Sequence, residues 1–222
     1  MQKPVDVFIA GSTGYMGSRL VPALRARGHR VYTLVRPGSE ARAPSGAISV
    51  VGNVLSRDSI AAAMPRGAVV VHLVGTPRPS PAKAAQFESL DLPAARECIA
   101  AAEAMEARRF VYVSVAHPAP IMKAYIDVRL RVEQLLRESS LPWTILRPWY
   151  VLGPGHRWPY ALIPMYWLLG ALPATRDGAK RLGLVTIRQM LAALVAAIED
   201  DDPTSEVLDV EAIRAIGQRA NS

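Results

Sequence analysis

Residues 5–17 read Val-Asp-Val-Phe-Ile-Ala-Gly-Ser-Thr-Gly-Tyr-Met-Gly. An apolar run leads straight into a turn with three glycines, and an amphipathic segment that stops near Gly28 follows. This order of strand, turn and helix is typical of dinucleotide binding, because glycines let the backbone approach a pyrophosphate at a helix N-terminus. The spacing is G-x-x-G-x-x-G rather than G-x-G-x-x-G, and a glycine-rich turn without a ligand is the alternative. The residues expected to contact the nucleotide here are Gly11, Ser12, Thr13, Gly14, Tyr15, Met16 and Gly17.

Length and composition indicate a single domain, 1–222, because half of the 222 residues are apolar and can form a full core. The lone Cys98 excludes an internal disulfide framework and a cysteine-based zinc cluster, and we expect no metal site. The net charge is +7, but the basic residues are scattered and form no run interleaved with aromatic residues. We therefore expect a solvated basic surface with some phosphate-binding positions rather than a nucleic-acid partner.

Nothing in the sequence indicates secretion or membrane insertion. The N-terminus, Met-Gln-Lys-Pro-Val-Asp, lacks the apolar core of a signal peptide. The longest uncharged run, Tyr160–Ala174, is shorter than a membrane span and contains Pro164 and Pro173. We expect a cytoplasmic monomer or homodimer without stable membrane insertion.

Short apolar runs rich in Val and Ile alternate with helical patterns over the first two thirds of the chain. This alternation predicts an α/β fold, a Rossmann-type doubly wound parallel sheet with helices on both faces. The predicted strands are Val5–Ala10, Arg30–Arg36, Ala47–Gly52, Ala68–Gly75, Arg109–Val115 and Trp143–Arg147. The predicted helices are Gly14–Arg27, Ser56–Met64, Leu92–Ala107 and Ile121–Glu138.

The pattern changes after Arg147, where prolines space out an aromatic-rich stretch. We expect residues 148–185 to form a small C-terminal extension that covers the substrate side. A helix then begins near Thr186, with Gln189 three residues later as a capping box.

Three positions that follow predicted strands are candidates for nucleotide contacts, because open α/β sheets bind ligands at the carboxyl ends of their strands. Arg36 ends the second strand, where an arginine suits the 2′-phosphate of NADP and an acidic residue would suit NAD; Arg42 could assist. Asn53 could hydrogen-bond an adenine edge, and Gly75 could let the backbone approach the cofactor. A surface arginine is the alternative for Arg36, and NAD stays possible.

Ser114, Tyr125 and Arg129 are candidates for proton transfer. Tyr125 and Arg129 are four residues apart and share a helix face, and a cation beside a tyrosine favours the tyrosinate. Ser114, at the end of the fifth strand, could hydrogen-bond a substrate carbonyl oxygen. A half-buried helix tyrosine without catalytic role is the alternative for Tyr125.

Four stretches together resemble the atypical short-chain dehydrogenases/reductases of the NAD(P)H-binding, NmrA-like and epimerase-like kind. These are Ile-Ala-Gly-Ser-Thr-Gly-Tyr-Met-Gly, Gly52-Asn53, Arg109-Phe-Val-Tyr-Val-Ser and Thr144-Ile-Leu-Arg-Pro-Trp-Tyr-Val-Leu-Gly-Pro-Gly. The chain is also similar to the nucleotide-binding accessory subunit of respiratory complex I. The resemblance implies that the nicotinamide end lies near Pro148, Trp149, Tyr150 and Val151, and that His156, Arg157 and Trp158 face the substrate. Val74 and Gly75 are expected to contact the cofactor because they lie at the carboxyl end of the fourth predicted strand.

The chain departs from this family's pattern at three places. Asn53 stands where the family has Asp, Val115 stands where a second serine is common, and Arg129 replaces the lysine of Tyr-x-x-x-Lys. An arginine does not reproduce the compact charge of a lysine. Two functions are therefore open: an oxidoreductase or epimerase-like enzyme for a small carbonyl or alcohol substrate, and a non-catalytic NAD(P)H-binding sensor or assembly subunit.

The segment Trp158–Leu169 is rich in aromatic and aliphatic residues. We expect it to wall an apolar pocket or to belong to the core. The alternative is a surface within 158–173 that docks on a membrane or a partner protein.

Overall fold

A seven-stranded parallel sheet forms the centre of the computed structural model, which describes residues 3–119, 121–155, 182–202 and 204–220. The order of its strands is β3-β2-β1-β4-β5-β6-β9. Successive strands are therefore added on one side of β1 up to β3 and on its other side from β4 onward, so the strand order reverses between β1 and β4. The strands are β1 (Asp6–Ala10), β2 (Arg30–Val35), β3 (Ile48–Val51), β4 (Val69–His72), β5 (Arg109–Val113), β6 (Trp143–Leu146) and β9 (Glu206–Leu208). The predicted doubly wound fold is confirmed, and so are all six predicted strands.

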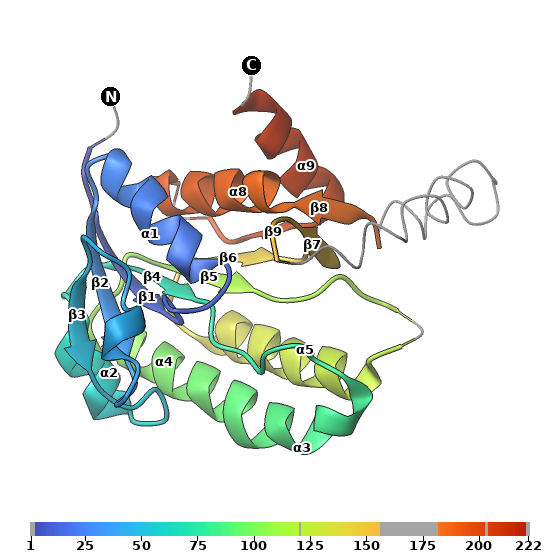
Figure 1. The fold of residues 1–222 in the computed structure, drawn as a ribbon, viewed down its shortest axis with the longest axis horizontal. Helices are drawn as coiled ribbons and strands as arrows, with labels where there is room; N and C mark the ends of the chain where they lie inside the picture. Colours follow the sequence, from blue (N-terminus) through green and yellow to red (C-terminus); the bar gives the residue numbers. More distant parts are fainter. Residues whose placement is uncertain (1–2, 120, 156–181, 203, 221–222) are drawn as a thin grey trace.

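Helices cover both faces of this sheet (Figure 1). The helices α1 (Gly17–Ala26), α8 (Ile187–Glu199) and α9 (Val210–Arg219) pack on one face. The other face carries α2 (Arg57–Ala63), α4 (Leu92–Ala104) and α5 (Lys123–Glu138). Shorter helical segments are η1 (Glu40–Arg42), η2 (Pro81–Lys83), α3 (Ala84–Gln86) and η3 (Phe87–Asp91), the last being a turn of π-helix.

The core has two halves because consecutive strand residues point to opposite faces of the sheet. Phe8 of β1 packs on the α2–α4–α5 side, while its neighbour Ile9 packs on the α1–α8–α9 side, and both are fully buried. The strands therefore have the nearly continuous apolar character of strands covered on both faces.

Three short strands differ from the sequence-based prediction. The strands β7 (Tyr150–Leu152) and β8 (Leu184–Thr186) pair in parallel as a separate two-stranded sheet, and β9 adds to the edge of the main sheet. Each has three residues, which is too short for a clear alternating pattern. The capping box that starts α8 is confirmed, because Thr186 and Gln189 exchange side-chain and backbone hydrogen bonds.

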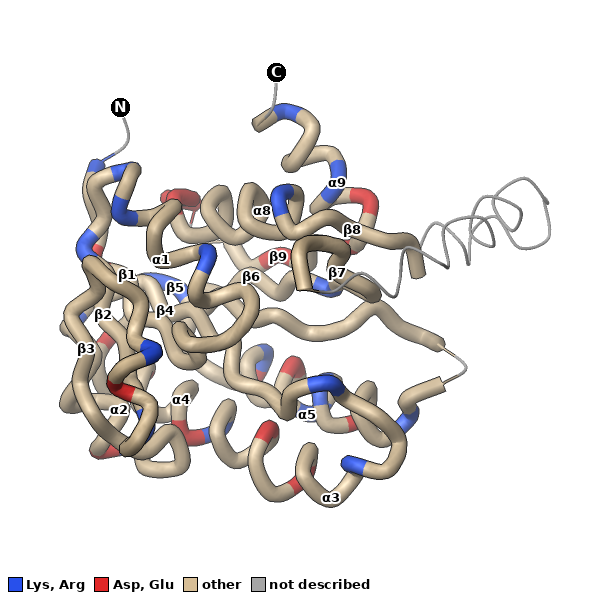
Figure 2. The backbone as a smooth tube through the Cα atoms, in the orientation of Figure 1, with Lys and Arg blue, Asp and Glu red and all other residues tan. Residues whose placement is uncertain are grey.

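Charged residues are spread over the molecule. Figure 2 shows Lys and Arg positions distributed over both helical layers among Asp and Glu positions. Within the described ranges, no helix has the length and apolar character needed to cross a bilayer.

Candidate functional site

The glycine turn after β1 has no room for a side chain at Gly11 or Gly17. Gly11 has a φ of +92°, and a Cβ there would lie 2.8 Å from the carbonyl carbon of Leu73 in the loop after β4. A Cβ on Gly17 would lie 2.5 Å from the carbonyl oxygen of Gly11. Gly14 is exposed, and its amide donates to the Gly11 carbonyl oxygen at 3.1 Å. The turn therefore lies between the carboxyl ends of β1 and β4, at the point where the strand order of the sheet reverses.

Two further features show that this turn fits the pyrophosphate of a dinucleotide. Helix α1 starts at Gly17 with no side-chain cap and no acidic residue in its first turn, so its N-terminus has no competing anion of its own there. The Ser12 hydroxyl is 1% exposed and has no hydrogen-bond partner among the described residues. A buried hydroxyl without a partner is costly, and a bound phosphate oxygen would satisfy it. Thr13 and Met16 are half-buried beside it.

Tyr15 connects the glycine turn to the segment after β7. Arg19 lies over the Tyr15 ring at 4.1 Å and donates to the Tyr15 carbonyl oxygen at 2.8 Å. Gly153 lies so close to the Tyr15 hydroxyl that a Cβ at this position would overlap it. The two motifs quoted for the resemblance, at residues 11–17 and 144–155, are therefore in contact.

Two arginines converge after β2. Arg36 donates from Nε to the Ser39 hydroxyl at 3.0 Å, and Arg42 donates from Nη2 to the same oxygen at 2.8 Å. Ser39 is 3% exposed, whereas both arginines are exposed. Within the described ranges neither arginine forms a salt bridge, so two positive charges adjoin one neutral hydroxyl.

Asn53 is exposed after β3, and its side chain organises the turn there. Its Oδ1 accepts a hydrogen bond from the Leu55 amide at 3.0 Å, and its own amide donates to the Ser59 hydroxyl at 2.9 Å. The side-chain oxygen thus accepts one hydrogen bond within this turn.

Gly75 lies beside the side chain of Arg129. A Cβ at Gly75 would lie 2.6 Å from Nη2 of Arg129, so the absence of a side chain here makes room for the guanidinium. That nitrogen donates to Oδ2 of Asp91 at 3.1 Å, and Oδ1 of Asp91 accepts from the amide and the hydroxyl of Thr76 at 2.9 and 2.8 Å. Val74, next to Gly75, packs against the α2–α4–α5 half of the core.

Arg129 lies on the face of α5 that it shares with Tyr125, as the spacing predicts. Its guanidinium stacks over the Tyr125 ring at 4.9 Å, while Nη1 donates to the Tyr112 hydroxyl at 3.1 Å and to the Val113 carbonyl oxygen at 3.3 Å. The pKa of Tyr112 rises to about 12 because burial outweighs the attraction of Arg129. Asp91 compensates the charge of Arg129. Tyr125 contacts the Arg129 guanidinium with the face of its ring.

His72, at the end of β4, is a packed core residue, as its apolar surroundings predict. Its ring lies 6.2 Å from the ring of Phe110 and 6.0 Å from that of Tyr112. Burial, with the nearby charge of Arg129, lowers the pKa of His72 to about 3, so the ring is neutral.

Ser114 donates its hydroxyl proton to a buried carboxylate. Oε1 of Glu133, a fully buried residue of α5, accepts from Ser114 at 2.7 Å and from Nε of Arg147 at 2.9 Å. Oε2 accepts from a second nitrogen of Arg147 and from Arg137 at 3.0 Å. Burial alone would raise the pKa of Glu133, but the donors Arg147, Ser114 and Arg137 outweigh it and hold that pKa below its usual range.

The segment Pro148–Val151 leaves β6 and enters β7. The Pro148 carbonyl oxygen accepts from the Ala116 amide at 2.9 Å, and the rings of Trp149 and Tyr150 meet edge to face at 5.3 Å. Burial raises the pKa of Tyr150. His156, Arg157, Trp158 and the whole of Trp158–Leu169 lie outside the described residues.

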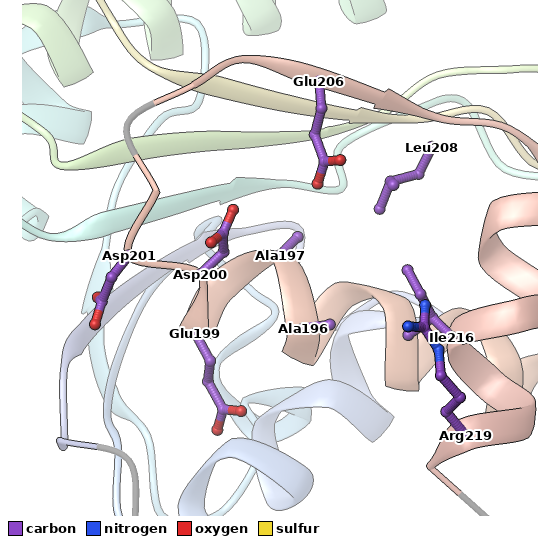
Figure 3. A pocket seen from close by; sticks show the side chains of 9 residues that line it. All are labelled: Ala196, Ala197, Glu199, Asp200, Asp201, Glu206, Leu208, Ile216 and Arg219. Carbon is purple, nitrogen blue, oxygen red and sulfur yellow. The ribbon is translucent and has the colours of Figure 1, made fainter.

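A cavity of about 630 Å³ lies between β9 and the C-terminal ends of α8 and α9, and none of the groups described above lines it (Figure 3). Three of its four acidic residues pair with arginines: Glu199 with Arg27 at 2.5 Å, Asp200 with Arg109 at 3.3 Å, and Asp201 with Arg108. Its lining residues are Ala196, Ala197, Glu199, Asp200, Asp201, Glu206, Leu208, Ile216 and Arg219. An acidic cavity at this edge does not suit a dinucleotide.

Sequence reasoning missed three residues that organise the site: Ser39, Asp91 and Glu133. Glu133 had a detectable signal, because it lies four residues from both Arg129 and Arg137 on one helix. Asp91 had none, since its partner Arg129 is distant in the sequence.

Comparison with known proteins agrees with this geometry. Residues 11–158 match the model of a family described as NAD(P)H-binding. A 3-diazoavenalumate denitrifying reductase from Streptomyces sp. is 32% identical over 88% of this chain and 72% of its own length. The mitochondrial NADH dehydrogenase [ubiquinone] 1 alpha subcomplex subunit 9 of Arabidopsis thaliana is 26% identical over 87% of this chain, which spans 50% of that subunit.

The fold has solved counterparts. The Bordetella bronchiseptica enzyme WbmH, solved in complex with NAD+, superposes with a TM-score of 0.69 over 97% of this chain and 80% of its own, at 20% identity. At this identity the likeness concerns the fold alone.

Proposed function

This chain belongs to the NAD(P)H-binding family, and from that premise we propose that it is an NADP(H)-dependent oxidoreductase that acts on a small carbonyl or alcohol substrate. The observation that carries the proposal is the glycine turn between β1 and β4, where the strand order of the sheet reverses. Its packing leaves no space for side chains at Gly11 and Gly17, and it holds a buried Ser12 hydroxyl without a described partner. A cytoplasmic location and a monomer or homodimer stay predictions.

The arginines after β2 support NADP(H) over NAD(H). Arg36 and Arg42 both donate to Ser39 and have no acidic partner among the described residues. Two charges placed this way suit the 2′-phosphate that distinguishes NADP, whereas a ribose hydroxyl would be better met by a carboxylate.

The other groups of the site would hold the rest of the nucleotide. Residues 11–17 would bind the pyrophosphate, and Pro148–Val151 would form the wall at the nicotinamide end. A bound reduced nicotinamide would supply hydride. Tyr125 is the candidate for moving a proton to or from the substrate oxygen, while Ser114 and Arg129 are already bonded to carboxylates.

Calorimetric titration of the wild-type chain and Arg36→Ala with NADPH and NADH tests this proposal. A charge-assisted hydrogen bond is typically worth about 1.5–3 kcal/mol, so we expect NADPH affinity to fall by about 10- to 150-fold and NADH affinity to change little. Arg30→Ala, at the opposite end of β2 and paired with Asp6, is the matched control. A wild-type preference for NADH, or equal losses for both nucleotides, would show that Arg36 does not select the nucleotide.

A second candidate is a non-catalytic NAD(P)H-binding protein. It is favoured by the commitment of Ser114 to Glu133 and of Arg129 to Asp91, which removes two of the three groups expected to assist proton transfer. A panel of carbonyls and quinones decides between the two, with 3-diazoavenalumate added because the Streptomyces relative is named for it. Turnover that falls by about 10²–10⁴-fold in Tyr125→Phe supports the enzyme. Tight NADPH binding without turnover supports the second candidate.

A further inference from the structure

We infer that Glu133 is a positioning residue for the nicotinamide-side wall, Pro148–Val151, and that it acts on this wall through Arg147 and Ser114. This inference rests on the proposed function, since it assumes that a nucleotide occupies the site. Glu133 itself lies on α5, behind the wall, and is fully buried.

The carboxylate of Glu133 joins three elements at the carboxyl edge of the sheet. It accepts from Ser114 at 2.7 Å, where the chain leaves β5, and from two nitrogens of Arg147, where the chain leaves β6. A bidentate arginine–carboxylate pair fixes both distance and orientation, which a single point contact does not. Glu133 therefore sets how the end of β6 lies relative to the end of β5 and to α5.

We call Glu133 with its donors Ser114 and Arg147 the clamp, and the wall begins directly after it. Arg147 precedes Pro148, and its amide donates to the Leu208 carbonyl oxygen at 2.8 Å, so backbone and side chain are both fixed. The Pro148 carbonyl oxygen in turn accepts from Ala116, two residues after Ser114, at 2.9 Å. The segment after β5 thus binds Glu133 through Ser114, and the segment after β6 binds it through Arg147.

The same contact defines the role of Ser114. A serine hydroxyl has one proton, and here that proton is directed to a carboxylate whose pKa is held low. Ser114 consequently serves the clamp and does not donate to a substrate carbonyl oxygen.

Binding of two nucleotides distinguishes a displaced wall from a general weakening of the nucleotide site. Adenosine 2′,5′-bisphosphate carries the adenosine, the 2′-phosphate that we assign to Arg36 and one phosphate for the glycine turn, but it has no nicotinamide, whereas NADPH also reaches the wall. In Glu133→Gln we expect about tenfold weaker binding of NADPH, the scale of one charge-assisted hydrogen bond, and unchanged binding of the bisphosphate. Glu138→Gln, an exposed position on the same helix, is the matched control and should bind both probes as the wild type does.

Arg147→Lys is a second variant, which keeps the charge but loses the bidentate geometry. It should give the same split between the two probes, and it decides the question if Glu133→Gln does not fold. Equal losses for both probes, or unchanged NADPH binding in a folded variant, would overturn the role of Glu133. Failure of the wild type to bind either probe would instead overturn the proposed function, and the inference with it.

Discussion

Removing the buried carboxylate of Asp91 should destabilise this fold strongly. It is 2% exposed, and its partner Arg129 is 6% exposed, so neither charge can turn to water. Asp91→Ala removes the ion pair at 3.1 Å and both acceptor contacts to Thr76. Breaking a buried ion pair by removing one partner typically costs about 3–5 kcal/mol, because the other charge stays buried without compensation.

Urea unfolding at neutral pH measures this loss of unfolding free energy, and thermal unfolding measures it as a fall in Tm. For a chain of this size 1 kcal/mol corresponds to about 2–4 °C in Tm, so we expect Tm to fall by about 6–20 °C. Glu88→Ala is the matched control. Glu88 lies on η3, as Asp91 does, and pairs at 2.7 Å with Arg131 of α5, the helix that carries Arg129. The side chains of Glu88 and Arg131 are 52% and 47% exposed. An exposed pair of this kind is worth less than about 1 kcal/mol.

A double-mutant cycle separates the charge from the other contacts of Asp91. Asp91→Ala combined with Arg129→Met removes both charges, so its cost should be about 2 kcal/mol or more below the sum of the single costs. Additive costs, or an Asp91→Ala variant within about 1 kcal/mol of the wild type, would refute the reasoning.

The sequence predicted the parallel sheet because its strands are covered on both faces and are therefore almost wholly apolar. Their carboxyl ends were predicted less well: the strand expected at Ala68–Gly75 ends at His72, and the one expected at Arg30–Arg36 ends at Val35. The residues beyond these points leave the sheet to form the site. After His72 the apolar character continues through Leu73 and Val74 although strand pairing has ended, so pattern alone does not locate that boundary.

The pairing of Tyr125 and Arg129 was predictable because a helix brings residues four apart onto one face. The counter-charge of Arg129 was not, since it comes from Asp91 on a π-helical turn that packs against α5 only in the folded chain. The same holds for Ser114: its position at the end of β5 followed from the sequence, whereas the direction of its hydroxyl depends on Glu133 and Arg147. Spacing within one element is encoded locally, and contacts between elements are set by packing.

Two further predictions concern the glycine turn and acid stability. Gly14→Val should abolish NADPH binding measured by calorimetry, because the added side chain would lie where the pyrophosphate approaches the backbone. The variant should still fold, since Gly14 has no positive φ and the added Cβ would meet only the Gly11 carbonyl oxygen, at 3.2 Å. Unchanged affinity would exclude this turn as the pyrophosphate site. The second follows from the lowered pKa of Glu133 in the folded state. A carboxyl group with a lowered folded pKa stabilises the fold above its unfolded pKa, near 4.5, and this contribution is lost as pH falls through the folded pKa. Ser114→Ala removes one of the donors that lower this pKa. The acid-induced loss of its unfolding free energy, followed by urea titration from pH 7 downward, should therefore be smaller than in the wild type and should end at a higher pH. If Glu133 were instead protonated and donating to Ser114, the variant would show no such upward shift.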